Sequence, residues 1–136
     1  MTLWHFSEEP DLRTFVPRDC PRATWWAAES TRDDDVERWL AGDRTRRVAA
    51  IEPTWLERVR DSTLYAYRMP EEPFDTVLDN RFYISSTTVE AIERVEVGDL
   101  LQRHADAEIE LRITPGLRAD FASVATTSLD YSGIRL

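Results

Sequence analysis

The hydrophobic positions of the first sixty residues change period several times, which predicts short strands and helices in turn. Strand-favouring runs occupy residues 2–6, 23–28 and 47–51. Before the third run, three aspartates at 33–35 precede apolar residues at 36, 39 and 40, and a glycine follows at 42. Acidic residues at the start, apolar residues at this spacing and a glycine after the end are typical of a helix. A second helix is expected to begin at Pro53, because proline is tolerated at the first helical position.

The second half of the chain predicts four strands and two helices. The strands are expected at 63–69, 81–86, 91–97 and 108–113. The helices are expected from Asp99 to His104 and over about 117–128. Residues 130–136 are expected to be ordered only if something docks them.

This order of elements has no regular βαβ rhythm, so the expected fold class is α+β. We expect a mainly antiparallel sheet with three or four helices. A chain of 136 residues is long enough to bury a sizeable core, and residues 1–136 are expected to form a single domain.

The net charge of the chain bears on the kinds of partner that it can bind. The chain has 17 arginines, no lysine and 26 acidic residues, for a net charge of −9. Such acidity disfavours bulk nucleic-acid binding, because phosphate backbones repel it. The absence of lysine is typical of a GC-rich coding genome, so a bacterial origin is expected. The chain has neither an apolar run long enough for a membrane span nor a leader pattern, and its single cysteine excludes an internal disulfide. A cytoplasmic location is therefore expected.

The segment with the most suggestive chemistry is residues 17–22, in which two prolines bracket Arg18 and Cys20 and Arg22 follows. Proline restricts the backbone, so the segment should be stiff and extended and should hold its two guanidinium groups in fixed places near Trp25. Guanidinium groups bind carboxylate and phosphate and stack on aromatic rings. Arg18, Arg22 and Trp25 are therefore candidate ligand-binding residues. The alternative is an ion pair between these arginines and nearby acids.

Several other side chains have two interpretations each. His5, on the first strand, could act as a general base or bind a ribose or phosphate, or it could cap a turn. Cys20 could be a nucleophile if the arginines lower its pKa, or a small buried apolar residue. Tyr83 could form the wall of a cleft together with Tyr65 and Tyr67, or pack in the core. No metal site is expected, since the cysteine and the two histidines lack the spacing of zinc ligands.

Three strings together resemble an uncharacterised bacterial family of unknown function. They are the HFSEEP opening at residues 5–10, PRDCPR at 17–22, and IELR at 109–112 followed by SGIR at 132–135. The resemblance spans nearly the whole chain and implies no established activity. It also implies a further strand between the first two strings, whereas here residues 15 and 16 run directly into Pro17. Either the pocket is reshaped or the activity is lost.

The chain also resembles the ADP-ribosyltransferase-like fold. There a histidine on the first strand contacts the ribose of NAD, and a later strand carries an aromatic residue and a serine. His5 matches the histidine, and Tyr83 and Ser85 match the later strand. The resemblance implies a glutamate that steers the attacking group, for which Glu90 is the nearest acid. NAD is the cofactor that this resemblance implies.

The leading hypothesis is a small protein with a nucleotide- or NAD-like anion pocket. In it His5 and Arg18 hold ribose or phosphate, Arg22 orients the anion and Tyr83 stacks on the base. One alternative is a non-catalytic interaction module that presents Trp25 and Trp26, or its acidic half, to a protein partner. Another is an enzyme that binds a small carboxylate metabolite through Arg18 and Arg22. Homodimerisation is compatible with each.

Overall fold

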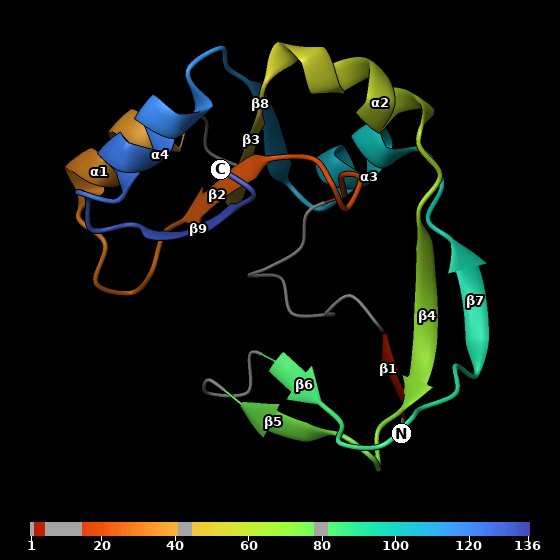
Figure 1. Cartoon of the computed structure of the whole chain (residues 1–136). Helices are drawn as coiled ribbons and strands as arrows, with labels where there is room; N and C mark the ends of the chain where they lie inside the picture. Colours follow the sequence, from red (N-terminus) through yellow and green to blue (C-terminus); the bar gives the residue numbers. More distant parts are fainter. Residues whose placement is uncertain (1, 5–14, 41–44, 78–81) are drawn as a thin grey trace. The chain divides into compact units, whose positions relative to one another are not determined.

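The computed structural model describes residues 2–4, 15–40, 45–77 and 82–136. The chain divides into two compact units. Unit 1 comprises Met1–Arg13 and Thr63–Gly98, and unit 2 comprises Thr14–Ser62 and Asp99–Leu136. Helices and mainly antiparallel strands are present, which confirms the α+β class (Figure 1). No helix in the described part of the chain is both long and apolar enough to cross a membrane.

Unit 2 is built on a four-stranded sheet in the order β8-β3-β2-β9. Its strands are β2 (Arg22–Trp26), β3 (Arg47–Ile51), β8 (Ile109–Ile113) and β9 (Asp130–Ile134). β2 pairs antiparallel with both β3 and β9, whereas β3 and β8 run parallel. The predicted strands 47–51 and 108–113 are thus confirmed. Residues 130–136 were expected to be ordered only if another segment bound them, and residues 130–134 pair with β2.

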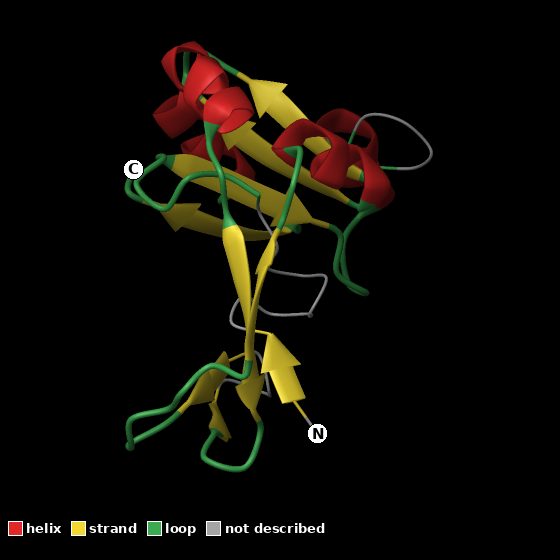
Figure 2. Ribbon diagram, turned by 90° about the vertical axis from the view of Figure 1, so that its right-hand side faces the viewer, coloured by secondary structure: helices red, strands yellow, loops and turns green. Residues whose placement is uncertain are grey.

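Four helices and one short 3₁₀ turn belong to the same unit, and Figure 2 shows them around its sheet. They are α1 (Asp33–Trp39), η1 (Pro53–Trp55), α2 (Leu56–Asp61), α3 (Leu100–Asp106) and α4 (Leu117–Val124). Asp99 caps α3 as expected, because its carboxylate accepts hydrogen bonds from the backbone N–H groups of Leu101 and Gln102.

The acidic start of α1 has a different role from the expected one. The N-cap residue is Arg32, and its side chain makes no capping bond. Instead, the carboxylate of Asp35 accepts hydrogen bonds from the backbone N–H of Ser128, at 2.9 Å, and from its hydroxyl, at 2.5 Å. These bonds hold the pKa of Asp35 below its usual value. They also fasten the segment after α4 to α1, which explains why α4 ends at Val124 rather than near residue 128.

Both faces of the sheet are covered at β3, since all five of its residues are buried. Residues that alternate along β2 and β3 point to one face, and side chains of α1 and α4 pack against them. The buried members of this first cluster are Ala23, Trp25, Leu40, Val48, Ala50, Leu117, Val124 and Leu129. Partly buried side chains, among them Val36 and Phe121, complete it.

The opposite face carries a second set of buried side chains. Ile51, which points away from Ala50 because strand residues alternate, is fully buried, as are Val59 on α2 and Leu100 and His104 on α3. These helices therefore cover the second face. His104 is the unexpected member, because a histidine is seldom placed in such a core.

The hydrogen bonds of His104 explain its burial. The Leu100 carbonyl can only accept, so the imidazole Nδ1 donates to it at 2.7 Å. The other nitrogen, Nε2, accepts from the backbone N–H of Phe15 at 3.3 Å, and the Phe15 ring stands edge-on at 5.4 Å. Both ring nitrogens are satisfied in the neutral form, and burial lowers the pKa of His104.

Unit 1 contains a three-stranded antiparallel sheet in the order β1-β4-β7 and the hairpin β5-β6. Its strands are β1 (Thr2–Trp4), β4 (Tyr65–Pro70), β5 (Asp75–Val77), β6 (Phe82–Ile84) and β7 (Glu93–Glu96). The predicted strands near 63–69, 81–86 and 91–97 are present in shorter form, and β5 was not predicted. Ala66 and Val97 are buried hydrophobic residues of this unit.

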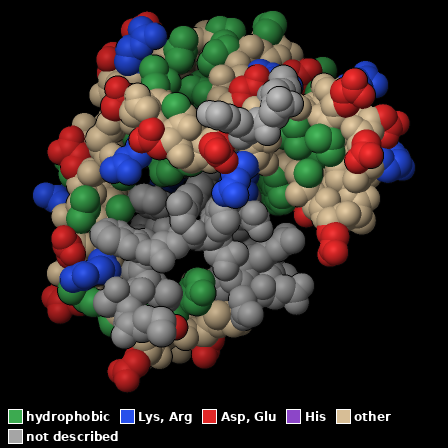
Figure 3. Space-filling model, turned by 180° about the vertical axis from the view of Figure 1, so that it is seen from behind, with side chains coloured by type: hydrophobic (Ala, Val, Ile, Leu, Met, Phe, Trp, Pro, Cys, Tyr) green, Lys and Arg blue, Asp and Glu red, His purple; other side chains and the backbone are tan. Residues whose placement is uncertain are grey.

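Figure 3 shows one face of the molecule. On it acidic and arginine side chains are interspersed, and the described residues form no large area of one charge. The two units differ in net charge. Unit 1 has four arginines and ten acidic residues, for a net charge of −6, and unit 2 has thirteen and sixteen, for −3.

The β2–β9 pairing predicts the effect of a side chain at Gly133. A Cβ there would lie 2.9 Å from two ring atoms of Phe121 and 2.6 Å from a methyl group of Leu136. Gly133→Ala should therefore displace the Phe121 ring and lower the free energy of unfolding by about 1–3 kcal/mol. Urea denaturation measures this change. Ser132→Ala, at the neighbouring position, is the control and should change stability by less than about 0.5 kcal/mol. Equal effects of the two substitutions would contradict the close approach.

The environment of His104 predicts a pH dependence. Its pKa is lowered in the folded protein, so below about 6.5 the unfolded chain takes up the proton first. The free energy of unfolding should therefore fall as the pH drops from about 6.5 to the folded-state pKa, and be insensitive to this group above 6.5. His104→Gln should be less stable at pH 7.5 but show a flatter profile between pH 7 and 5. Urea titrations at several pH values, with His5→Gln as the control, test this. An unchanged slope in His104→Gln would refute it.

Candidate arginine site at the start of strand β2

Residues 17–22, named here the arginine turn, form a tight turn that leads into β2. The backbone N–H of Cys20 donates to the carbonyl of Pro17 at 3.0 Å, which leaves Arg18 and Asp19 exposed at the corner. The segment is thus a closed turn rather than the extended stretch that its prolines suggested. Arg22 is the first residue of the strand and is partly buried.

The Arg22 guanidinium is directed at its own turn. Its Nη1 donates to the backbone carbonyls of Cys20 at 3.1 Å, Pro17 at 3.3 Å and Arg18 at 3.4 Å. Its Nε is buried and has no hydrogen-bond acceptor in the described part of the chain. Burial lowers the pKa of Arg22. One edge of this guanidinium therefore stabilises the turn, while the remaining N–H groups are not engaged by these bonds.

Two further arginines lie beside the turn, and the sequence analysis did not select either. Arg22 is opposite Ile134 in the β2–β9 register, so Arg135 follows directly, near enough for its charge to add to the lowering of the Arg22 pKa. Arg58, on α2, pairs with Asp19 at 3.2 Å and stacks over the Trp55 ring at 4.5 Å. The tail and α2 thus each bring a cation to the arginine turn.

Cys20 is fully buried between these groups. Burial raises the pKa of its thiol to about 11, although Arg22 acts in the opposite direction. The sulfur lies 3.4 Å from the carbonyl oxygen of Pro21, to which the thiol can donate. The interpretation of Cys20 as a small buried residue therefore agrees with its environment, and a thiolate nucleophile does not.

Trp25 and Trp26 are buried, so the surface that they were expected to present to a partner does not exist. Trp25 belongs to the first core cluster, and its indole N–H donates to the carbonyl of Trp39 at 2.9 Å. Trp26 is covered on one ring face by the guanidinium of Arg47 at 4.9 Å. Trp25 points into the core because strand alternation aligns it with Ala23, and it offers no open ring face to a ligand of the arginine turn.

The remaining predicted site residues belong to unit 1. Tyr83 is 38% exposed on β6, and Ser85 follows that strand, where its hydroxyl donates to the carbonyl of Thr87 at 2.9 Å. Glu90 is exposed. His5 lies outside the described residues. The structure thus brings Arg18 and Arg22 together, and separately Tyr83 and Ser85, while a shared site of the two pairs stays a prediction.

Two of the three tyrosines that could have formed a cleft, Tyr65 and Tyr83, lie apart. Tyr65 begins β4, whereas the β5-β6 hairpin that carries Tyr83 lies beyond the other end of that strand (Figures 1 and 2). Tyr65 instead stacks with Arg94, whose guanidinium carbon is 4.6 Å from the ring centre.

An open pocket of about 360 Å³ is found elsewhere in unit 2. It is lined by Thr45, Ala105, Asp106, Glu108, Ile109 and Glu110. Because Thr45 lies just before β3 and Ile109 begins β8, the pocket is at the opposite end of the sheet from Arg22. Its lining is acidic, whereas the predicted pocket was lined by arginine.

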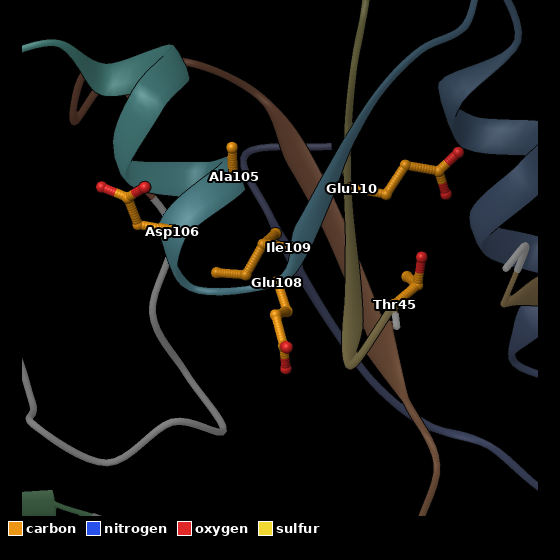
Figure 4. A pocket seen from close by; sticks show the side chains of 6 residues that line it. All are labelled: Thr45, Ala105, Asp106, Glu108, Ile109 and Glu110. Atoms are coloured by element: carbon orange, nitrogen blue, oxygen red, sulfur yellow. The ribbon is translucent and has the colours of Figure 1, made fainter. Parts of the chain in front are cut away.

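The carboxylates of this pocket do not converge. Figure 4 shows Asp106, Glu108 and Glu110 pointing in different directions. Glu108 pairs with Arg46 at 3.1 Å and Glu110 with Arg112 at 2.6 Å. Asp106 accepts from the side-chain amide of Gln102 at 2.8 Å. No cluster of potential metal ligands occurs among the described residues. These acids are therefore engaged in local pairs.

The burial of Cys20 predicts low reactivity. With a pKa of about 11, only about one thiol in a thousand is ionised at pH 8. Labelling of the native protein by a thiol reagent at pH 8 should be slower by at least about tenfold than labelling of the same protein in denaturant. Mass spectrometry over a time course measures both rates. Equal rates would contradict the burial of this residue.

The comparisons with known proteins yield one match. A family model described as a family of unknown function (DUF6886) covers residues 2–136. Neither the curated proteins nor the solved structures include a significant match. The expected membership of an uncharacterised family is confirmed, and it carries no activity with it. Since the match covers nearly every residue, the chain belongs to the DUF6886 family.

Proposed function

We propose that the protein binds a phosphate-bearing small molecule of the nucleotide class at the arginine turn. The observation that carries this proposal is that Arg135 directly follows Ile134, the register partner of Arg22, so that the charges of the two arginines lie close enough to interact. The two guanidinium groups repel each other, and a bound anion would relieve this repulsion.

Other groups near the turn favour the same ligand. The carboxylate of Asp19 is paired with Arg58, so it leaves the charges of Arg18 and Arg135 uncompensated. Neither of these two arginines has an ion pair within the described part of the chain. A locally positive region in a chain with a net charge of −9 is unusual, and it would raise the local concentration of an anion.

Phosphate is the preferred anion because several guanidinium forks can share its oxygens. Within this class NAD is included because of the resemblance to ADP-ribosyltransferases. A dicarboxylate is the competing ligand class, since guanidinium groups bind carboxylates as well.

The proposal is tested by thermal-shift and calorimetric titration with inorganic phosphate, ADP, NAD and succinate at constant ionic strength. A ligand at about one hundred times its Kd should stabilise the protein by about 2.7 kcal/mol. Arg135→Gln should weaken binding at least about tenfold, because one charge-assisted contact is lost. Arg135 is exposed, so the variant should fold.

Arg118→Gln is the matched control, because Arg118 is an exposed arginine on α4 and the change in net charge is the same. The proposal fails if no phosphate-bearing ligand binds at millimolar concentration, or if Arg135→Gln and Arg118→Gln bind equally well. Tighter binding of succinate than of ADP would favour the carboxylate alternative.

A further inference from the structure

The aromatic ring of Trp55 lies at the same end of the sheet as the arginine turn. β3 runs antiparallel to β2, so Ala50, near the end of β3, is opposite Ala23, near the start of β2. The 3₁₀ turn η1, which carries Trp55, begins two residues after the last residue of β3. The ring is therefore held close to the point where the arginine turn leads into β2.

Two contacts link this ring to the arginine turn. The guanidinium carbon of Arg58 lies 4.5 Å from the centre of the Trp55 ring, and Nη2 of the same side chain lies 3.2 Å from the carboxylate of Asp19, which belongs to the turn. The charges of Arg22, Asp19 and Arg58 all shift the pKa of the buried Cys20 thiol. These three charged groups therefore lie near one another, with the indole beside them.

The ring is fixed, whereas the guanidinium that covers it can move. Trp55 is partly buried, and its backbone N–H donates to the carbonyl of Glu52 at 3.1 Å, which closes the 3₁₀ turn that Pro53 begins. The Arg58 side chain is 58% exposed and that of its partner Asp19 is 54% exposed. Exposed ion pairs of this kind contribute little to stability, so a shift of this guanidinium costs little free energy. A flat group can therefore reach the face of the ring.

We propose that Trp55 is the residue on which the base of a purine nucleotide stacks while the phosphates of the nucleotide bind at the arginine turn. This inference rests on the function proposed above and narrows its ligand class to nucleotides with a large, flat base. The base lies between the indole and the guanidinium of Arg58, because aromatic rings and guanidinium planes both stack on bases. Arg58 stays beside Asp19 in this arrangement, so the positive charge of the turn is preserved.

The experiment compares ADP with inorganic pyrophosphate, which has two linked phosphates but no base. Both are titrated into the full chain by calorimetry at constant ionic strength. Trp55→Leu should weaken ADP binding about tenfold and change pyrophosphate binding by less than about twofold, because it removes only the contact with the base. Tyr131→Leu, which removes an exposed aromatic ring from β9, is the control and should bind ADP like the wild type.

Trp55→Phe provides a second measurement, which does not depend on the folding of the leucine variant. It should bind ADP within about threefold of the wild type, because a phenyl ring also stacks on a base. Adenine that stacks on an indole quenches its fluorescence. ADP should therefore quench the tryptophan emission of the wild type and leave the emission of Trp55→Phe unchanged.

The outcomes separate this inference from the proposed function. If both ligands bind and both lose affinity in Arg135→Gln, but Trp55→Leu binds ADP like the wild type, the inference is wrong and the proposed function stands. The same holds if Trp55→Leu weakens both ligands equally, or if ADP quenches the wild type and Trp55→Phe alike. If neither ligand binds the wild-type chain at millimolar concentration, the proposed function fails and this inference fails with it.

Discussion

The antiparallel pairing of β2 with β9 is the contact on which most of this structure depends. β2 contributes Trp25 to the core, and β9 completes the sheet beside it. The pairing requires a residue without a side chain at position 133, where the Phe121 ring approaches most closely. It also brings the last residues of the described chain next to the arginine turn. Without this register, Arg22 and Arg135 would not be neighbours.

The arginine turn is held together by one nitrogen of the Arg22 side chain. Its Nη1 donates to three backbone carbonyls, and the remaining N–H groups of the guanidinium are not used in these bonds. A lysine could not serve in the same way, because a single ammonium group lacks the planar fork of a guanidinium. The burial of Cys20 fits this picture, since the thiol fills space under the turn without adding charge. The turn is a structural feature first, and any ligand would bind to an arrangement that the fold already maintains.

The sequence predicted most strands and helices because their signals are local. Alternation marked residues 108–113, and Asp99 marked the start of α3. What it could not predict depends on distant partners. Residues 130–134 form a strand because they pair with the edge of β2. Asp35 accepts a hydrogen bond from Ser128 instead of capping its own helix. Trp25 was expected to contact a ligand because it lies close in sequence to Arg18 and Arg22, whereas strand alternation turns it toward the core. His104 escaped notice because its two partners, Phe15 and Leu100, are set by tertiary packing. Arg58 and Arg135 were missed for the same reason.

The place of β9 in the chain has a consequence for how the protein is made. The strand follows every other element of its sheet in sequence, while its partner β2 is among the first to be synthesised. During translation one edge of β2 therefore stays unpaired until residues 130–134 have emerged. Contacts between such distant segments form slowly, because the entropy of closing a long loop is lost before the contact can stabilise the chain. Nascent chains of this protein should accordingly be most prone to aggregation, and most dependent on chaperones, just before residues 130–134 leave the ribosome.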